Sequence, residues 1–308
     1  MIRTASKTKL LYQLFMSNQQ SQTKCFKINL IVISCGIGFM AFNFLMQIAV
    51  STITKNLRKN PTVIELGNQR FRYSDACLTH CEKTSGKTIR RPVDYVWEFF
   101  EDIGFSSYQA IDVNTELKSI AMDLNFNLKE KYSYTDTFDL VTNNGTGEHI
   151  FDQKAVFENM HNLCKVGGVM INVLPFAPWL NHGFYNFNPN LFRDVSAANE
   201  YKWNFLWLGQ NTGLHAEVPF DIKSWGFHEN KHPYKPASNL EKLFQHLHNQ
   251  NNSKTNISLV CAYTKTKDAP FQIPMQGRYV NDVSSSLKES YSDSNTDTRQ
   301  KDHTSSFY

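Results

Sequence analysis

The clearest pattern in the chain is a series of short apolar runs, each followed by polar residues. Seven such runs predict strands, at residues 62–66, 108–112, 119–123, 137–142, 169–174, 203–208 and 257–264. Apolar residues at helical spacing predict helices at 38–57, 93–103, 151–163, 189–199 and 238–249. Strands that alternate with helices in this way predict an α/β fold, a seven-stranded doubly wound sheet with helices on both faces.

Two polar stretches and a glycine pair interrupt this alternation. Residues 75–91 contain Thr84-Ser-Gly-Lys-Thr88, and we expect an inserted loop there. The pair Gly167-Gly168 is expected to end the preceding helix. From about residue 282 the composition is too polar to form a core. These features predict a mobile basic leader (1–27), an N-terminal helical segment (28–60), a main domain (61–281) and a disordered tail (282–308).

Basic residues are distributed unevenly along the chain. Residues 1–64 carry eight Lys or Arg and no acid, whereas the remainder carries 24 basic and 28 acidic residues. Such a start is typical of a transit peptide, a membrane anchor or a polar tail before a first helix. Residues 28–50 are uncharged over a length that can span a bilayer, although Asn29, Asn43 and Gln47 dilute their hydrophobicity. A buried amphipathic helix is the favoured interpretation, and a membrane span through 28–50 is the alternative.

Composition narrows the class of protein further. With 41% hydrophobic and 13% aromatic residues, a chain of 308 residues can bury a large core. The six cysteines are too scattered for a disulfide framework, which favours a reducing compartment. We expect a cytoplasmic protein, with a membrane-anchored or mitochondrial location as the alternative. No interleaved basic and aromatic pattern indicates nucleic-acid binding.

Polar residues gather where three of the apolar runs end. The first run ends in Glu65, Gly67 and two amides, the second ends in Asp112, and the fourth leads into Asn143-Asn144-Gly145. Open α/β sheets bind ligands just beyond the carboxyl ends of their strands. The sequence therefore predicts a nucleotide-type binding site at this edge of the sheet.

Several short motifs in order carry a family resemblance. The succession is Val63-Ile-Glu-Leu-Gly67, Ala110-Ile-Asp112, Ala121-Met-Asp-Leu124, Asp139-Leu-Val-Thr-Asn-Asn144 and Cys164-Lys-Val-Gly-Gly168. Together they resemble a class I S-adenosylmethionine-dependent methyltransferase over about residues 38–279. The resemblance implies a mostly parallel seven-stranded sheet whose antiparallel last strand is inserted beside the sixth.

The resemblance also implies roles for individual residues. It assigns Glu65 and Gly67 to the loop that holds the methionine part of the cofactor, S-adenosylmethionine, and Asp112 to both ribose hydroxyls, which suits the two acceptors of a carboxylate. It assigns Asp123 and Leu124 to the adenine. The remaining predicted cofactor contacts are Asn68, Gln69, Asn143, Asn144 and Gly145.

The chain departs from the family pattern in three places, of which the first two bear on the cofactor residues and the third disfavours a base or amide nitrogen as the acceptor. Gln69 and Phe71 replace further glycines of the first loop, so close approach of the backbone to a ligand is less assured. The distance from Gly67 to Asp112 is about twice the usual length. The loop after the fourth predicted strand lacks the Asn/Asp-Pro-Pro-aromatic signature of enzymes that methylate amino groups.

Acceptor-side candidates lie in the loops after the fourth and fifth strands. His149 could orient or deprotonate a hydroxyl group, because imidazole titrates near neutral pH. His182, Tyr185 and Asn186 lie in an aromatic loop of the kind that builds partly apolar pockets. As lone polar residues in loops, all four could equally serve packing.

No metal site is predicted from the sequence. Cys77, His80 and Cys81 offer three ligands without a second pair at suitable spacing, and His228 and His232 do not form the zinc-protease pattern.

These observations favour an enzyme that transfers a methyl group from S-adenosylmethionine to a small or medium-sized acceptor molecule, with oxygen slightly favoured as the acceptor atom. The competing hypothesis is a non-catalytic binding module that keeps the fold but no longer binds the cofactor.

Overall fold

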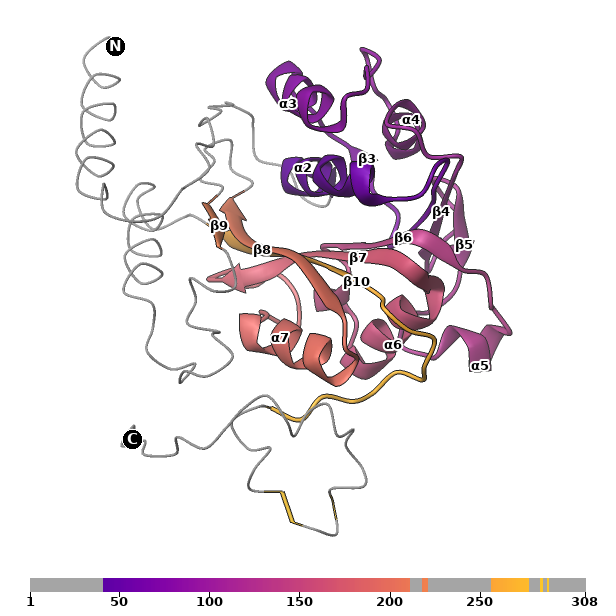
Figure 1. The fold of residues 1–308 in the computed structure, drawn as a ribbon, viewed down its shortest axis with the longest axis vertical. Helices are drawn as coiled ribbons and strands as arrows, with labels where there is room; N and C mark the ends of the chain where they lie inside the picture. The colour runs from indigo at the N-terminus through magenta and orange to yellow at the C-terminus, as the bar shows by residue number, and fades with distance from the viewer. Residues whose placement is uncertain (1–40, 211–217, 221–255, 277–282, 285–286, 288–308) are drawn as a thin grey trace, which may run out of the picture.

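A single large sheet organises the part of the chain that the computed structural model describes, which is residues 41–210, 218–220, 256–276, 283–284 and 287 (Figure 1). In these residues the sheet has eight strands in the order β5-β4-β2-β6-β7-β10-β8-β9. The strands are β2 (Thr62–Leu66), β4 (Ser107–Asp112), β5 (Ser119–Ala121), β6 (Phe138–Asn144), β7 (Cys164–Ala177), β8 (Lys202–Gln210), β9 (Val218–Phe220) and β10 (Ile257–Thr264). β5, β4, β2, β6 and β7 pair in parallel, and β10 is antiparallel to both β7 and β8.

The strand order confirms the predicted fold class. All seven predicted strands are present, and the last of them, β10, lies between β7 and β8 as the resemblance to class I methyltransferases implied. The short strand β9, which pairs antiparallel with β8, was not predicted. The predicted helix at 238–249 lies outside the described residues.

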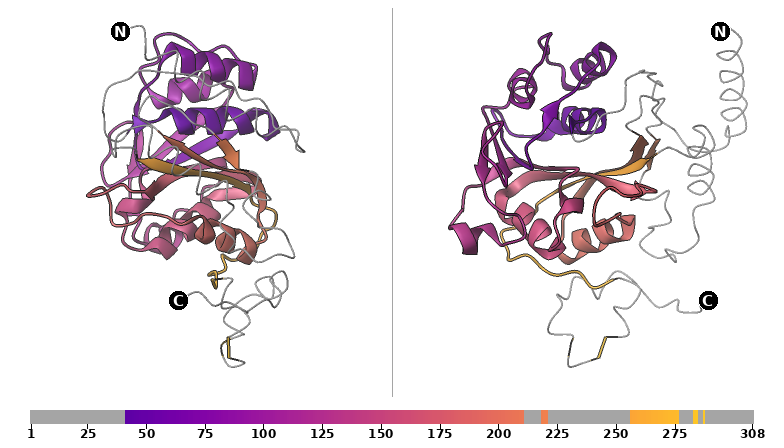
Figure 2. Two further views of the ribbon diagram at one scale, coloured as in Figure 1. Left: turned by 90° about the vertical axis from the view of Figure 1, so that its left-hand side faces the viewer. Right: turned by 180° about the vertical axis from the view of Figure 1, so that it is seen from behind.

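Helices cover both faces of the sheet (Figures 1 and 2). One face carries α2 (Phe44–Ile53), α3 (Asp75–Ser85) and α4 (Val96–Asp102), and the other carries α5 (Leu128–Tyr132), α6 (Gln153–Leu163) and α7 (Pro189–Ala198). Two single 3₁₀ turns, η1 (Thr54–Asn56) and η2 (Gly147–His149), complete the described helical elements. Each face has its own apolar core, as expected for strands that are buried on both sides.

The helix α2 is part of this core. Leu45, Met46, Val50 and Ile53 are all buried, and Asn43 caps the helix by accepting a hydrogen bond from the backbone N–H of Met46. Just before it, β1 (Ala41–Phe42) pairs in parallel with β3 (Arg70–Phe71). Among the described helices, none has the length and apolar character needed to cross a bilayer. The second half of the uncharged stretch at 28–50 therefore forms a packed helix, and residues 28–40 lie outside the described residues.

The predicted loop at 75–91 is wrong over residues 75–85, where the chain forms α3. Ser74 caps this helix by accepting from the N–H of Cys77, and Gly86, with φ of 73°, ends it in the left-handed conformation that glycine adopts readily. Cys77, Leu78 and Cys81 form its buried stripe. The two cysteines therefore serve packing on this helix.

The predicted helix end at Gly167-Gly168 is also wrong. The helix α6 stops at Leu163, and β7 starts with the next residue and runs through both glycines. The N–H of Gly167 donates to the carbonyl oxygen of Lys265, and the N–H of Lys265 donates to that of Gly168. A β-carbon on Gly168 would come within 3.0 Å of Asp139 O, so the glycine allows a close approach to the neighbouring strand β6.

Candidate functional site

The predicted cofactor residues lie at the carboxyl ends of adjacent parallel strands. β2 is flanked by β4 and β6, and Leu66 is in register with Ile111 on one side and Asn143 on the other. Residues that follow these strands are therefore brought to one edge of the sheet, as predicted.

The turn after β2 is tied to the end of β4. Gly67 has φ of 81°, which favours glycine, and its N–H donates to the carbonyl oxygen of Ile111 over 2.7 Å. The N–H of Asn68 donates to Asp112 Oδ2 over 2.9 Å, and Asn114 Nδ2 donates to Asp112 Oδ1 over 2.8 Å. Asp112 is half-buried, and each of its oxygens keeps acceptor capacity beyond these bonds. The Asp112 carboxylate is thus held in place by hydrogen bonds within the protein, and its oxygens can still accept hydrogen bonds from a ligand.

Glu65 points into the protein. Its side chain is 1% exposed, Tyr108 Oη donates to its Oε2 over 2.6 Å, and Thr142 Oγ1 donates to its Oε1 over 3.3 Å. Burial raises the pKa of the Glu65 carboxyl group to about 8, and the two hydrogen bonds oppose this only in part. At neutral pH this carboxyl group is mostly protonated, and in the described conformation it has almost no surface to offer a ligand.

The two amides at the end of β6 are also buried. Asn143 Nδ2 donates to Asn172 Oδ1 over 3.0 Å, while Asn143 Oδ1 accepts from the N–H of Gly147 over 2.9 Å. Asn144 Oδ1 accepts from Asn43 Nδ2 over 2.9 Å. Gly145 follows with φ of 68° and turns the chain into η2. These amides hold the loop after β6 in place, and direct contact with a cofactor stays a prediction for all three residues.

Gln69 bridges the loops that follow β2 and β6. Its Nε2 donates to the carbonyl oxygen of Asn144 over 3.0 Å, and its Oε1 is buried without a partner among the described residues. Thr146 lies directly above the turn, since a β-carbon on Gly67 would come 2.2 Å from Thr146 Oγ1. A ligand that lies across Gly67 requires the Thr146 side chain to turn away.

Asp123 and Leu124 lie beyond the end of β5. Asp123 Oδ1 accepts from the N–H and the side-chain amide of Asn125, which makes a local turn, and Leu124 is buried in the core. Asn125 Oδ1 in turn accepts from the N–H groups of Phe151 and Asp152. This loop is therefore joined to the segment before α6, and its contact with adenine stays a prediction.

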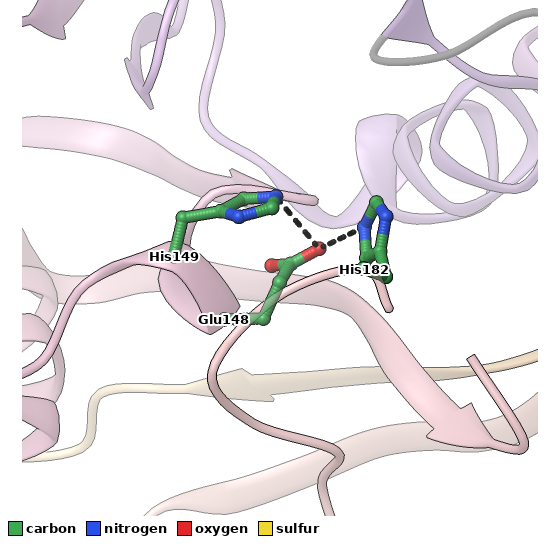
Figure 3. A group of neighbouring side chains, drawn as sticks. All are labelled: Glu148, His149 and His182. Carbon is green, nitrogen blue, oxygen red and sulfur yellow. Dashed lines mark hydrogen bonds and ion pairs between the residues drawn. The ribbon is translucent and has the colours of Figure 1, made fainter. Parts of the chain in front are cut away.

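A second group of polar side chains lies at the ends of β6 and β7 (Figure 3). Glu148 and His149 come from η2, and His182 comes from the loop between β7 and α7. Glu148 Oε1 lies 3.2 Å from His182 Nε2 and 4.0 Å from His149 Nε2. The two imidazole rings lie edge to face with centroids 4.9 Å apart. The structure thus joins His149 and His182, which were predicted separately, through the carboxylate of Glu148.

Close packing of the two loops fixes this arrangement. The N–H of Phe184 donates to the carbonyl oxygen of Glu148 over 2.8 Å, and a β-carbon on Gly183 would come 2.8 Å from that same oxygen. The ring of Trp179 lies 4.6 Å from that of His182, and its Nε1 donates to the carbonyl oxygen of Ile257. His182 is therefore held from both sides.

The other two acceptor-side candidates do not join the cluster. Tyr185 Oη donates to the carbonyl oxygen of Phe151, and Asn186 Nδ2 donates to that of Pro178. Both bonds stabilise the loop that carries His182, and substrate contact stays a prediction for Tyr185 and Asn186.

Glu148 is the functional candidate that sequence reasoning missed. It stands between a glycine and a histidine in a turn, where no periodic pattern predicts burial, yet it is only 1% exposed. Its burial depends on Gly183, which lies 35 residues further along the chain. The buried acid lies beside two histidines only because the loops after β6 and β7 pack together, and this contact cannot be read from the sequence.

Two surface cavities, with volumes of about 180 and 370 Å³, lie at the opposite edge of the sheet. Both are lined by His161, whose Nδ1 bonds Tyr201 Oη and whose Nε2 bonds the carbonyl oxygen of Ala269. Burial lowers the pKa of His161 to about 4 and raises that of the Cys164 thiol, which lines the larger cavity, to about 12. Both ring nitrogens of His161 are already hydrogen-bonded, and the Cys164 thiol stays protonated. This edge is therefore a weaker candidate for a functional site than the carboxyl edge.

Comparison with known proteins gives matches among solved structures alone. No family model matches the chain, and no curated protein matches it. The chain is similar to the YcgJ protein from Bacillus subtilis, with 12% identity over 72% of this chain and 99% of that chain and a TM-score of 0.40. It is also similar to the O-methyltransferase of a trans-AT PKS multienzyme from Brevibacillus brevis in complex with S-adenosyl-L-homocysteine (8% identity, 78% and 85% covered, TM-score 0.39).

A third similar structure is the N-methyltransferase NodS from Bradyrhizobium japonicum, also in complex with S-adenosyl-L-homocysteine, with 9% identity over 72% of this chain and 86% of that chain and a TM-score of 0.38. At such identities these matches concern the arrangement of the chain alone. The fold class rests on the strand order of the sheet, with β10 inserted between β7 and β8.

Proposed function

We propose that the protein transfers a methyl group from S-adenosylmethionine to an oxygen atom of a small or medium-sized acceptor. The observation that carries the proposal is the position of Asp112, whose carboxylate is fixed beside the Gly67 turn at the edge where β4, β2 and β6 end. In a sheet of this order, that edge is where a nucleotide ligand binds.

The residues at this edge fit both ends of the cofactor. Asp112 offers acceptors to the two ribose hydroxyls. The orphaned Oε1 of Gln69 suits a charged amino group, such as that of the methionine part, because a buried acceptor without a donor is costly. S-adenosylmethionine supplies the methyl group on a good leaving group, so the protein has to position the reactants and exclude water.

The acceptor side of the proposed site is the cluster of Glu148, His149 and His182. It follows the ends of β6 and β7, next to the Asn143–Asn144 segment that borders the Gly67 turn. We assign activation of the acceptor hydroxyl to His149, whose Nε2 is buried and makes no hydrogen bond with the described residues. His182 is assigned to the positioning of the acceptor.

Replacing Asp112 with asparagine is expected to weaken the binding of S-adenosylhomocysteine by about 100-fold, because the amide nitrogen cannot accept from one ribose hydroxyl and the remaining oxygen carries no charge. Asparagine keeps an acceptor for the N–H of Asn68, although its amide nitrogen cannot accept from Asn114 Nδ2. Isothermal titration calorimetry measures the effect, and Asp136→Asn, which removes an exposed carboxylate before β6, is the matched control. Equal affinity of both variants would remove the ribose assignment. If the wild-type protein itself does not bind the ligand, the non-catalytic module becomes the better hypothesis.

The Gln69→Leu substitution is expected to act on one end of the ligand. It removes the orphaned acceptor at similar size, together with the bond from Nε2 to the carbonyl oxygen of Asn144, and we expect about tenfold weaker binding of S-adenosylhomocysteine. Methylthioadenosine lacks the amino-acid part, so its affinity should not change, whereas Asp112→Asn should weaken both ligands. Competition binding of the two ligands measures the difference. Equal losses for both ligands in Gln69→Leu would show a general disturbance of the loop and contradict the assignment.

A further inference from the structure

The arrangement of Glu148, His149 and His182 leaves ligand atoms unused in a buried position. Glu148 is 1% exposed, and its Oε2 has no hydrogen-bond partner among the described residues. The buried Nε2 of His149 also lacks one. A carboxylate that is taken out of water is costly unless it is paired or coordinates a metal. The cluster therefore has buried oxygen and nitrogen atoms that its own hydrogen bonds do not use.

The spacing of the three groups is close to that of a metal site. One atom from each residue lies within 4.8 Å of the others. Ligands about 2.0–2.1 Å from a tetrahedral ion are about 3.3 Å apart. The distance from Glu148 Oε1 to His182 Nε2 is already 3.2 Å, and the 4.0 Å to His149 Nε2 requires a small inward rotation of that ring. Figure 3 shows both imidazoles directed at the same carboxylate.

We infer that Glu148, His149 and His182 bind a divalent cation of the zinc class. Two imidazoles and one carboxylate suit Zn²⁺ or Co²⁺, whereas Mg²⁺ and Ca²⁺ prefer oxygen ligands alone. The sequence did not predict this site, because its three ligands come from two loops. The three metal ligands that the sequence offered as a cluster, Cys77, His80 and Cys81, lie on α3 instead, where both thiols are buried.

The cation would have an open coordination position, because three protein ligands leave the fourth place of a tetrahedral ion to another molecule. Where this rests on the proposed function, that molecule is the acceptor, whose oxygen the cation orients and makes easier to deprotonate. With the cation bound, His149 and His182 act on the acceptor through the cation, and the Nε2 of His149 is no longer a base. The binding of the cation itself needs neither cofactor nor acceptor, so the two proposals can fail separately.

The test is titration of the full-length protein, stripped with a chelator, with Zn²⁺ and in parallel with Co²⁺. We expect binding that Glu148→Gln and His182→Ala each weaken at least about tenfold, a loss of the size that disturbing a metal site produces. His80→Ala is the matched control, since it removes one histidine beside two cysteines and should leave the affinity unchanged. Mg²⁺ should not compete at equal concentration.

A positioning variant separates ligand loss from misfolding. Gly183→Ala keeps all three ligand residues but pushes the loop that carries His182 away from Glu148, because its new methyl group would lie 2.8 Å from the carbonyl oxygen of Glu148. We expect weaker Zn²⁺ binding in a protein that still unfolds cooperatively. Zn²⁺ should raise the unfolding temperature of the wild type and not that of His182→Ala.

Two results would overturn the inference. One is the absence of Zn²⁺ and Co²⁺ binding by the wild-type protein. The other is binding that Glu148→Gln and His182→Ala leave unchanged, which would place the ion elsewhere in the chain. Titration of the same preparations with S-adenosylhomocysteine reports on the proposed function independently, so loss of one activity is not mistaken for loss of the other.

Discussion

Glu65→Gln is expected to remove most of the loss of stability that the protein undergoes as the pH rises from about 5 to 8. In the folded protein burial raises the pKa of Glu65 to about 8, against an ordinary value of 4.5. Between these values the folded chain keeps a proton that the unfolded chain has released. Rising pH therefore favours the unfolded state, and the stability that is fully present below about pH 4.5 is lost as the pH approaches 8.

The size of this effect follows from the difference between the two pKa values. It corresponds to a change in the free energy of unfolding on the order of 5 kcal/mol, a large part of the stability of an ordinary domain. Glutamine is neutral at every pH and has the size of the protonated acid. Its carbonyl oxygen can still accept from Tyr108 Oη. The variant and the wild type should therefore be similarly stable at pH 5, and the variant should be clearly more stable at pH 8.

Urea unfolding of both proteins at pH 5, 6, 7 and 8 gives the comparison, with Glu116→Gln as the control because the side chain of Glu116 is exposed. The control should follow the wild-type curve. Parallel curves for Glu65→Gln and the wild type would mean that Glu65 ionises normally and faces solvent. Glu65 would then be available to contact the cofactor, as the sequence predicted.

The fold was largely predictable because most of its strands can be recognised from the local sequence alone. β2, β4, β6 and β10 are apolar runs that need no partner to be recognised, whereas the position of β10 in the sheet was implied only by the resemblance to class I methyltransferases. The helix α3 was missed for a local reason too. Its buried stripe is short and consists mostly of cysteines, which were weighed as ligands, although Ser74 and Gly86 marked both of its ends.

The site was less predictable because its geometry depends on contacts between distant loops. The location of Asp112 at the carboxyl edge could be predicted from its place at the end of β4, since parallel strands end at one edge of the sheet. Whether Glu65 and Asn143 face a ligand or the core depends on Tyr108, Thr142 and Asn172, which no local pattern connects to them. The departures at Gln69 and Phe71 also have structural reasons. Gln69 bridges two loops, and the ring of Phe71 stacks 5.8 Å from that of Phe42.

Asn143 links the core to the site, and its replacement by leucine is expected to cost about 3 kcal/mol or more. Leucine has a similar shape but leaves two buried groups without their partner, the N–H of Gly147 and Oδ1 of Asn172. Each such group costs about 1–3 kcal/mol. Asn143 and Asn172 are both fully buried, so water cannot replace the lost bonds. Urea unfolding measures the loss.

A double-mutant cycle with Asn172→Leu separates the bond between the two amides from the other effects. Replacing both partners by apolar groups is less costly than leaving one unpaired, so the double variant should be more stable than the sum of the single losses predicts. Because Gly147 begins the turn that carries Glu148 and His149, Asn143→Leu should also weaken Zn²⁺ binding. A variant that loses stability but binds Zn²⁺ as tightly as the wild type would show that the turn holds its shape without Asn143, and that the cluster is positioned by the Gly183 loop instead.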